Sequence, residues 1–170
     1  MFEKTLRCFL AFFVVFCFNG AASAQSLAEP KARVVLTVSG KIGRANESGL
    51  VQFDLAMLNA LPQQTIRTRT PWYPGVSEFS GPLLADVLML VEASGTVIMA
   101  SALNDYSVAI PVSDAREHGV VLATSLNGRP MSVRDKGPVF IVYPFDSKVE
   151  LRSATYYERS IWQLKSLALR

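Results

Sequence analysis

The chain has 170 residues, with 17 Lys plus Arg, 14 Asp plus Glu and two cysteines, Cys8 and Cys17. This length suits one domain with a real hydrophobic core. The near-neutral charge, without basic clusters, argues against nucleic acid as a partner.

Residues 1–24 have the pattern of a secretory signal peptide. A positively charged start precedes the apolar run 8–18, and Ala-Ser-Ala at 22–24 predicts cleavage before Gln25. The apolar run is too short for a spanning helix, which needs about 20 residues. We therefore expect an exported protein that does not span the membrane after cleavage; an uncleaved anchor is the alternative.

Cleavage would change the chemistry that the chain can perform. It removes two basic residues, one acidic residue and both cysteines, which leaves 15 basic and 13 acidic residues. Without a thiol, the exported chain cannot form a disulfide framework, a Cys-ligated metal site or a cysteine nucleophile.

The remaining sequence predicts many short strands and two short helices. Residues 25–32 are polar and contain Ala and Pro, which favours a flexible leader before one domain at 33–170. Asp54 is a plausible N-cap for the first helix, and Gly81-Pro82 opens the second. These elements predict an α+β domain with a mixed β-sheet. We expect strands at 33–39, 50–53, 63–70, 96–102, 106–112, 119–125, 139–143 and 161–169. Helices are expected at 55–60 and 83–91, and a helical turn at 113–116.

The stretch 65–90 carries the most distinctive chemistry. Its alternating strand is followed by a loop rich in Pro, Gly and aromatic residues, which is expected to expose Trp72, Tyr73, Glu78 and Phe79 at a rim. Trp72 lies between two prolines, so a rigid loop would hold its ring ready to stack on a planar ligand. Asn104, Asp105 and Tyr106 would form a facing wall if the two loops adjoin.

The other candidate residues have simpler interpretations. His118, the single histidine, is expected to be a solvated turn residue, because nothing nearby resembles a catalytic triad or a metal cluster. Asp114, Asp135 and Asp146 are expected in turns and caps. Trp162 is expected to fill part of the core, at the start of the last strand.

Five segments, taken in order, resemble the sulfite-oxidase-type molybdopterin-binding domain family. The resemblance covers roughly residues 33–169 and implies that family's fold. The segments are FSGPLLADVL at 79–88, ALNDYSVAIP at 102–111, LATSLNGRPM at 122–131, GPVFIVYP at 137–144 and IWQLK at 161–165.

The chain departs from that family at the metal ligand. The family's enzymes hold molybdenum through a cysteine thiolate in the loop after the strand equivalent to 65–70, where this chain has Thr70-Pro71-Trp72-Tyr73. No cysteine of the exported chain replaces it, so bound molybdenum and redox catalysis are not expected.

The thiol-free pattern resembles more closely the PruR-type exported pterin-binding regulators. That resemblance implies a periplasmic protein that binds a reduced pterin such as tetrahydromonapterin. It also implies a partner, the periplasmic region of an inner-membrane enzyme that synthesises or hydrolyses cyclic-di-GMP. The aromatic rim and one carboxylate would complement the pterin ring and its 2-amino edge, and Arg134, Tyr156 and Arg159 are expected to contact its hydroxylated side chain.

Two other functions remain open on the sequence alone. One is a molybdopterin-dependent oxidoreductase that uses a non-cysteine ligand or a partner subunit. The other is a partner-binding module with an empty, degenerate pocket.

Overall fold

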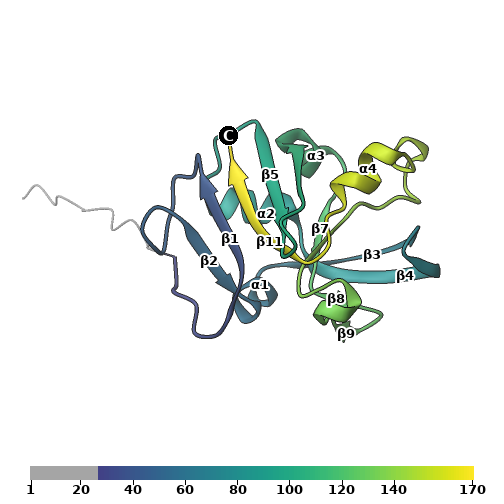
Figure 1. Cartoon of the computed structure of the whole chain (residues 1–170), viewed down its shortest axis with the longest axis horizontal. Helices are drawn as coiled ribbons and strands as arrows, with labels where there is room; N and C mark the ends of the chain where they lie inside the picture. Colours follow the sequence, from purple (N-terminus) through teal and green to yellow (C-terminus); the bar gives the residue numbers. More distant parts are fainter. Residues whose placement is uncertain (1–26) are drawn as a thin grey trace, which may run out of the picture.

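Three β-sheets organise residues 27–170, the part of the chain that this computed structural model describes. The expected signal peptide and its cleavage site lie outside the described residues. Figure 1 shows the largest sheet on one side of the domain and a long hairpin projecting from the other. Among residues 27–170, no helix is long and apolar enough to cross a membrane.

The largest sheet is mixed and contains five strands in the order β2-β1-β11-β5-β6. β1 and β11 are parallel, and every other neighbouring pair is antiparallel. In β1, Leu36 and Val38 are fully buried while Thr37 between them is partly exposed, as the two-residue period of a strand requires. The strands are β1 (Val34–Gly40), β2 (Val51–Asp54), β5 (Val97–Ala102), β6 (Ser107–Pro111) and β11 (Leu164–Leu169).

The other two sheets are antiparallel. One has the order β3-β4-β8-β9 and contains the long hairpin, and the second is the pair β10-β7. Both supply buried side chains to the core, which includes the fully buried rings of Phe53, Phe79 and Phe140. The strands are β3 (Gln63–Thr70), β4 (Tyr73–Pro82), β8 (Ser125–Leu126), β9 (Arg129–Pro130), β7 (Val121–Ala123) and β10 (Phe140–Val142).

The aromatic loop predicted after β3 is instead the strand β4. β4 spans Tyr73–Pro82 and pairs with β3 at every position except Pro74 and Gly75; its burial alternates from Ser77 to Gly81, so that Phe79 is 0% exposed rather than at a rim. Pro74 lies at the hairpin end, where a strand tolerates a missing N–H. A register shift between Arg69 and Thr70 accommodates the turn residues.

Gly81 allows β4 to pass close to β7. A Cβ atom at this position would lie 2.0 Å from the carbonyl oxygen of Leu122. The Gly-Pro pair therefore has a packing role as well as its predicted role at the start of the following helix.

The described residues form four α-helices and two 3-10 helices; the two predicted helices and the predicted helical turn at 113–116 are among them. The predicted cap is confirmed, because Asp54 accepts a hydrogen bond from the amide of Met57 at 2.8 Å. This bond, with those from Lys31 and Ala32, holds the pKa of Asp54 below its ordinary value. The helices are α1 (Leu55–Ala60), α2 (Leu84–Leu90), α3 (Val112–Glu117), α4 (Ala154–Arg159), η1 (Val133–Asp135) and η2 (Val149–Leu151).

The described part of the expected flexible leader, residues 27–32, is attached to the domain. The amides of Lys31 and Ala32 donate to Asp54 at 2.8 and 3.0 Å, and Asn46 donates to the carbonyl of Ala28 at 2.8 Å. The carboxylate that caps α1 therefore also fixes the chain that enters β1.

Asp114 is not the exposed turn or cap residue that the sequence suggested. Its side chain is buried and accepts hydrogen bonds from Tyr143 at 2.8 Å and Arg159 at 2.9 Å. His118 is also not solvated as expected. It is half-buried, its Nε2 lies 3.3 Å from the hydroxyl of Tyr156, and its buried Nδ1 has no hydrogen-bond partner among residues 27–170. Tyr143 and the α4 residues Tyr156 and Arg159 pack around these two side chains.

Candidate functional site

A pocket of about 300 Å³ lies beside the tip of the β3–β4 hairpin, and we call it the Trp72 pocket. It gathers residues from the hairpin turn, the β5–β6 loop, α4 and the segment between α4 and β11. Its principal side chains are aromatic, amide and carboxylate groups. They are Trp72, Asn104, Tyr106, Tyr157, Glu158, Trp162 and Gln163.

Trp72 forms a fixed wall of this pocket. Its ring centroid lies 5.3 Å from that of Phe140 and 6.1 Å from that of Tyr157, both in edge-on geometry. It also lies 6.2 Å from Phe145. The ring is therefore packed between core and α4, which corrects the expectation of a freely exposed loop aromatic.

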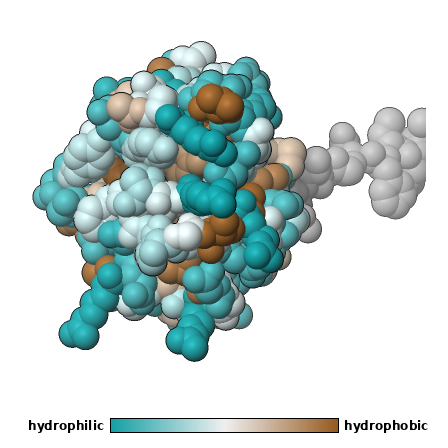
Figure 2. Space-filling model, turned by 90° about the vertical axis from the view of Figure 1, so that its right-hand side faces the viewer, coloured by the Kyte–Doolittle hydropathy of each residue, from teal (hydrophilic) through white to brown (hydrophobic). Residues whose placement is uncertain are grey.

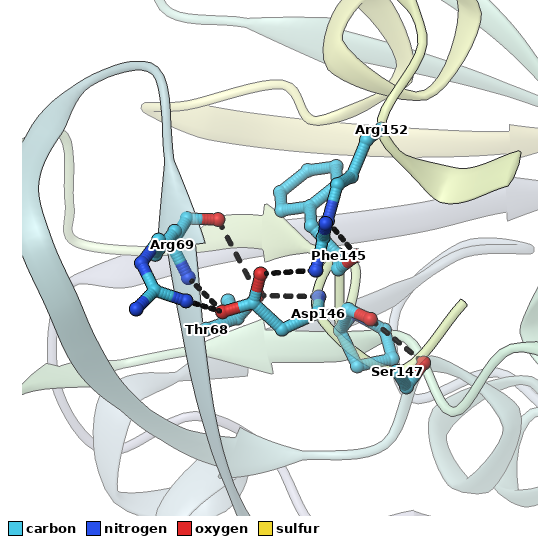
Figure 3. Close-up of polar contacts among 7 residues, drawn as sticks. Thr68, Arg69, Phe145, Asp146, Ser147 and Arg152 are labelled. Carbon is cyan, nitrogen blue, oxygen red and sulfur yellow. Dashed lines mark hydrogen bonds and ion pairs between the residues drawn. The ribbon is translucent and has the colours of Figure 1, made fainter. Parts of the chain in front are cut away.

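Asp146 braces the hairpin tip that carries Trp72 (Figure 3). Its carboxylate accepts from the backbone amide of Arg69 at 2.8 Å and from the guanidinium of Arg152 at 2.9 Å. Its own amide donates to the hydroxyl of Thr68 at 3.0 Å. Asp146 was expected to be a turn residue, and the structure shows that it also joins β3 to the segment leading to α4.

Trp162 is an exposed wall residue and not the predicted core residue. It is 42% exposed, and the Nζ of Lys136 lies 4.2 Å from its ring centroid. The same Nζ lies 5.9 Å from the ring of Tyr73. β11 begins only at Leu164, after Gln163 with a positive φ of 52°, so Trp162 precedes the strand that was expected to bury it.

The β5–β6 loop supplies the facing wall, as predicted for Asn104 and Tyr106. Tyr106 is 46% exposed, and its amide donates to the side chain of Asn104 at 3.2 Å. Asp105 does not line the pocket. Its hydrogen bond and ion pair with Lys165 lower the pKa of its carboxyl.

The structure brings together three of the ten predicted site residues, namely Trp72, Asn104 and Tyr106. The other seven lie elsewhere. Tyr73 donates to the backbone carbonyl of Asp135 at 2.9 Å, and burial raises the pKa of its phenol. Asp114, His118, Tyr143, Tyr156 and Arg159 form a group that we call the Asp114 cluster, joined by the contacts described above. The remaining positions are Glu78 opposite Arg67 in the hairpin register, Phe79 in the core, Asp105 beside Lys165, Arg134 on η1, and Tyr156 and Arg159 in the Asp114 cluster.

Sequence reasoning missed the contribution of residues 157–163. Tyr157 and Glu158 lie on α4, a helix that was not predicted, and Trp162 and Gln163 precede β11 rather than beginning it. Glu158 is the carboxylate that lines the pocket, the role expected of Glu78 or Asp105.

Figure 2 views the face that carries the hairpin tip and α4. Apolar side chains appear there as separate patches between polar ones, rather than as one broad apolar surface.

The residues at this site do not suit a molybdenum ion. The turn after β3 contains Pro71 and Trp72, and the sequence has no cysteine after Cys17. Among residues 27–170, no group of three or more His, Cys, Asp or Glu residues could hold a metal ion. Soft thiolate ligation is therefore not provided by the described chain.

Comparison with known proteins gives one family and one fold. The family model described as "Oxidoreductase molybdopterin binding domain" matches residues 31–147. Among solved structures, the chain is similar to the sulfane dehydrogenase SoxCD from Paracoccus pantotrophus, with 15% sequence identity and a TM-score of 0.59. The similarity covers 79% of this chain and 37% of that one, so this chain spans well under half of the SoxCD chain. No curated protein matches the chain.

Proposed function

The chain belongs to the oxidoreductase molybdopterin-binding domain family, and from this premise we propose that it binds a pterin as a signal and is not an enzyme. One observation carries the proposal. The Trp72 pocket keeps aromatic and carboxylate walls, while the turn after β3 has no thiol to hold a metal. Such a site can hold the organic ring of a cofactor without performing metal chemistry.

The pocket side chains complement a reduced pterin. Trp72, Tyr106 and Trp162 offer ring faces or edges to a flat bicyclic ligand. The carboxylate of Glu158 can accept two parallel hydrogen bonds from the 2-amino and N3–H groups, as a carboxylate does from a guanidinium. The pocket volume of about 300 Å³ lies at the lower end of the usual range for small-molecule sites. Tetrahydromonapterin is the ligand that we propose.

The partner we propose is the periplasmic region of an inner-membrane enzyme that synthesises or hydrolyses cyclic-di-GMP. The N-terminal signal pattern supports export to the periplasm, and the resemblance to PruR-type regulators supports this partner. In this proposal, the liganded protein sets the balance between synthesis and hydrolysis on the other side of the membrane.

A molybdopterin-dependent oxidoreductase is the second candidate, because the family description names that class. It would need a non-cysteine ligand or a partner subunit to hold the metal. Metal analysis of protein from a host that makes the cofactor separates the two candidates. Stoichiometric molybdenum would overturn the signalling proposal.

Pterin extraction and titration test the preferred function directly. Protein purified without oxygen should release a fluorescent pterin after denaturation and oxidation, and should bind tetrahydromonapterin with micromolar affinity or better. Finding neither would refute the proposal. A receptor complex that forms equally well without any pterin would support the degenerate-pocket alternative.

Trp162→Ala is the single variant that best tests the site, because Trp162 lines the pocket without packing into the core. It should weaken pterin binding by about 1 kcal/mol or more, the scale of an aromatic contact. Trp72→Ala should weaken binding at least as much but also destabilise the fold, since its ring packs on Phe140. Met89→Ala, at a 72% exposed position on α2, is the control and should leave affinity unchanged.

A further inference from the structure

A second pocket, of about 550 Å³, lies on the open face of the five-stranded sheet, and we call it the sheet pocket. Its floor is formed by β1 and β11, where Thr37 and Ser166 are register partners. Both are partly exposed, while the neighbouring Leu36 and Leu167 point into the core. The walls come from the β5–β6 loop and from residues 131–138.

The walls of the sheet pocket are mainly aliphatic. Leu103 is 43% exposed and Val133 is 45% exposed, although both are large apolar residues. Val35, Met131 and Pro138 also line it, and no aromatic side chain does. Clustered exposed apolar groups of this kind mark interaction sites. Without ring faces, however, the pocket does not suit a planar heterocycle such as a pterin.

The charged residues that line the sheet pocket are all basic. They are Arg33 and Lys165, and no carboxylate is among the lining residues. Arg33 makes no ion pair with any residue in the range 27–170, while Lys165 pairs with Asp105, whose side chain is 85% exposed. An apolar cavity with cationic residues and hydroxyl groups complements a molecule with an aliphatic body and one anionic end.

The sheet pocket is separate from the Trp72 pocket. Leu103 and Leu164 line the former, while the adjacent Asn104 and Gln163 line the latter. A hydrogen bond of 2.9 Å from the amide of Leu103 to the carbonyl of Gln163 closes the wall between them. Occupancy of one pocket therefore does not require occupancy of the other.

We propose that the sheet pocket is a second ligand site, which binds a medium-chain aliphatic carboxylate. The aliphatic chain lies against Val35, Leu103 and Val133, and the carboxylate faces Arg33. The proposal depends on the lining residues alone and stands whether or not the Trp72 pocket binds a pterin.

Fluorescence competition tests this site. The purified protein is titrated with 1-anilinonaphthalene-8-sulfonate, an anionic amphipathic dye, and the bound dye is displaced with decanoate. Decanoate should displace the dye at concentrations where decanol and decyltrimethylammonium do not. Equal displacement by all three compounds would overturn the proposal, because it would show apolar adsorption without anion recognition.

Two variants with matched controls locate the site. Arg33→Glu should lower decanoate affinity about tenfold or more, since it reverses the charge facing the carboxylate. Lys31→Glu makes the same charge change two residues earlier, outside the pocket, and should keep affinity within about twofold. Ser166→Trp should fill the floor and abolish binding, while Ser39→Trp, on β1 but outside the lining, should not.

Circular dichroism checks that each variant folds. If Ser166→Trp does not fold, the decanoate affinity of Arg33→Glu still tests the proposal. Unchanged decanoate affinity in folded Arg33→Glu would overturn the proposal. The proposal would also be overturned if the protein did not bind decanoate while Ser166→Trp abolished binding of a protein partner. That result would identify the sheet pocket as a protein docking site. Tetrahydromonapterin affinity, measured in parallel, should be the same for Arg33→Glu and the unchanged protein.

Discussion

Replacing Tyr143 with phenylalanine should lower the free energy of unfolding by about 1.5–3 kcal/mol, the usual value of a buried hydrogen bond to a charged group. The Tyr143 side chain is 0% exposed, and its hydroxyl lies 2.8 Å from Oδ2 of Asp114. Phenylalanine fills the same space as the ring, so the loss measures the hydrogen bond and not a new large cavity. Tyr106→Phe, at a 46% exposed position, is the control and should change stability by less than about 0.5 kcal/mol.

Arg159→Met tests the other partner of the same carboxylate oxygen. Its guanidinium lies 2.9 Å from Oδ2 of Asp114, but the Arg159 side chain is 22% exposed. Partial exposure reduces the 3–5 kcal/mol expected for a fully buried pair to about 1–3 kcal/mol. Because Tyr143 and Arg159 share one oxygen, the double variant should deviate from additivity by about 0.5 kcal/mol or more.

Urea unfolding at pH 7, followed by circular dichroism, measures the free energy of unfolding of Tyr143→Phe, Arg159→Met and the double variant. Pterin titration of the folded proteins measures their ligand affinity. We expect pterin affinity to be unchanged in Arg159→Met, because Arg159 lies in the Asp114 cluster and not in the Trp72 pocket. A Tyr143→Phe protein as stable as the unchanged one would refute the role of the cluster. A folded Arg159→Met protein that loses pterin affinity would refute the placement of the site.

Three further predictions follow from other contacts. Gly81→Ala should lower the free energy of unfolding by about 3 kcal/mol or more, or prevent folding, because the new Cβ atom would lie 2.0 Å from the carbonyl oxygen of Leu122. A melting temperature equal to that of the unchanged protein would contradict this packing. Burial raises the pKa of Tyr143 above its ordinary value of 10.0, so the native state keeps a proton that the unfolded chain loses above that pH. The contribution of this phenol to stability should be constant below pH 10 and fall by about 1.4 kcal/mol per pH unit above it, so urea titrations of Tyr143→Phe should show a smaller alkaline loss of stability than those of the unchanged protein. Lys165→Gln should shift the melting temperature by no more than about one degree, because its ion pair with Asp105 is exposed; a large drop would show that the pair stabilises the fold.

Local sequence signals predicted much of this fold correctly. The α+β class and the sulfite-oxidase-like molybdopterin-binding fold are confirmed by the family match and by the similarity to SoxCD. Asp54 caps α1 as predicted, because capping depends on a side chain and an amide three residues apart. The strands β3 and β5 were found from β-branched and alternating residues, which report burial directly.

The errors arose where tertiary packing overrode local composition. Pro74 and Gly75 suggested a loop, but they are only an irregularity within β4, because Tyr73 and the residues from Val76 onward pair with β3 on either side of them. α4 has a polar, tyrosine-bearing sequence with no strong apolar period, and it forms through contacts with the rest of the domain. As a result, Glu78 and Phe79 were placed at a rim that does not exist.

The candidate site was predicted in part for the same reason. Trp72, Asn104 and Tyr106 do line one pocket, because the turn after β3 and the loop after β5 lie side by side there. Glu158 and Trp162 could not be assigned to the pocket from sequence, because their positions depend on where α4 ends and where β11 begins. Arg159 was expected to contact the hydroxylated side chain of the pterin, but it does not line the Trp72 pocket and donates instead to the buried Asp114.

The order of strands in the largest sheet also constrains when the domain can fold. β11, from the C-terminal end of the domain, lies in the middle of the order β2-β1-β11-β5-β6 and joins β1 to β5. The sheet therefore cannot close until residues 164–169 are available, and closing such a long loop is slow. Under the export that we propose, the five-stranded sheet could not be completed before residues 164–169 had crossed the membrane.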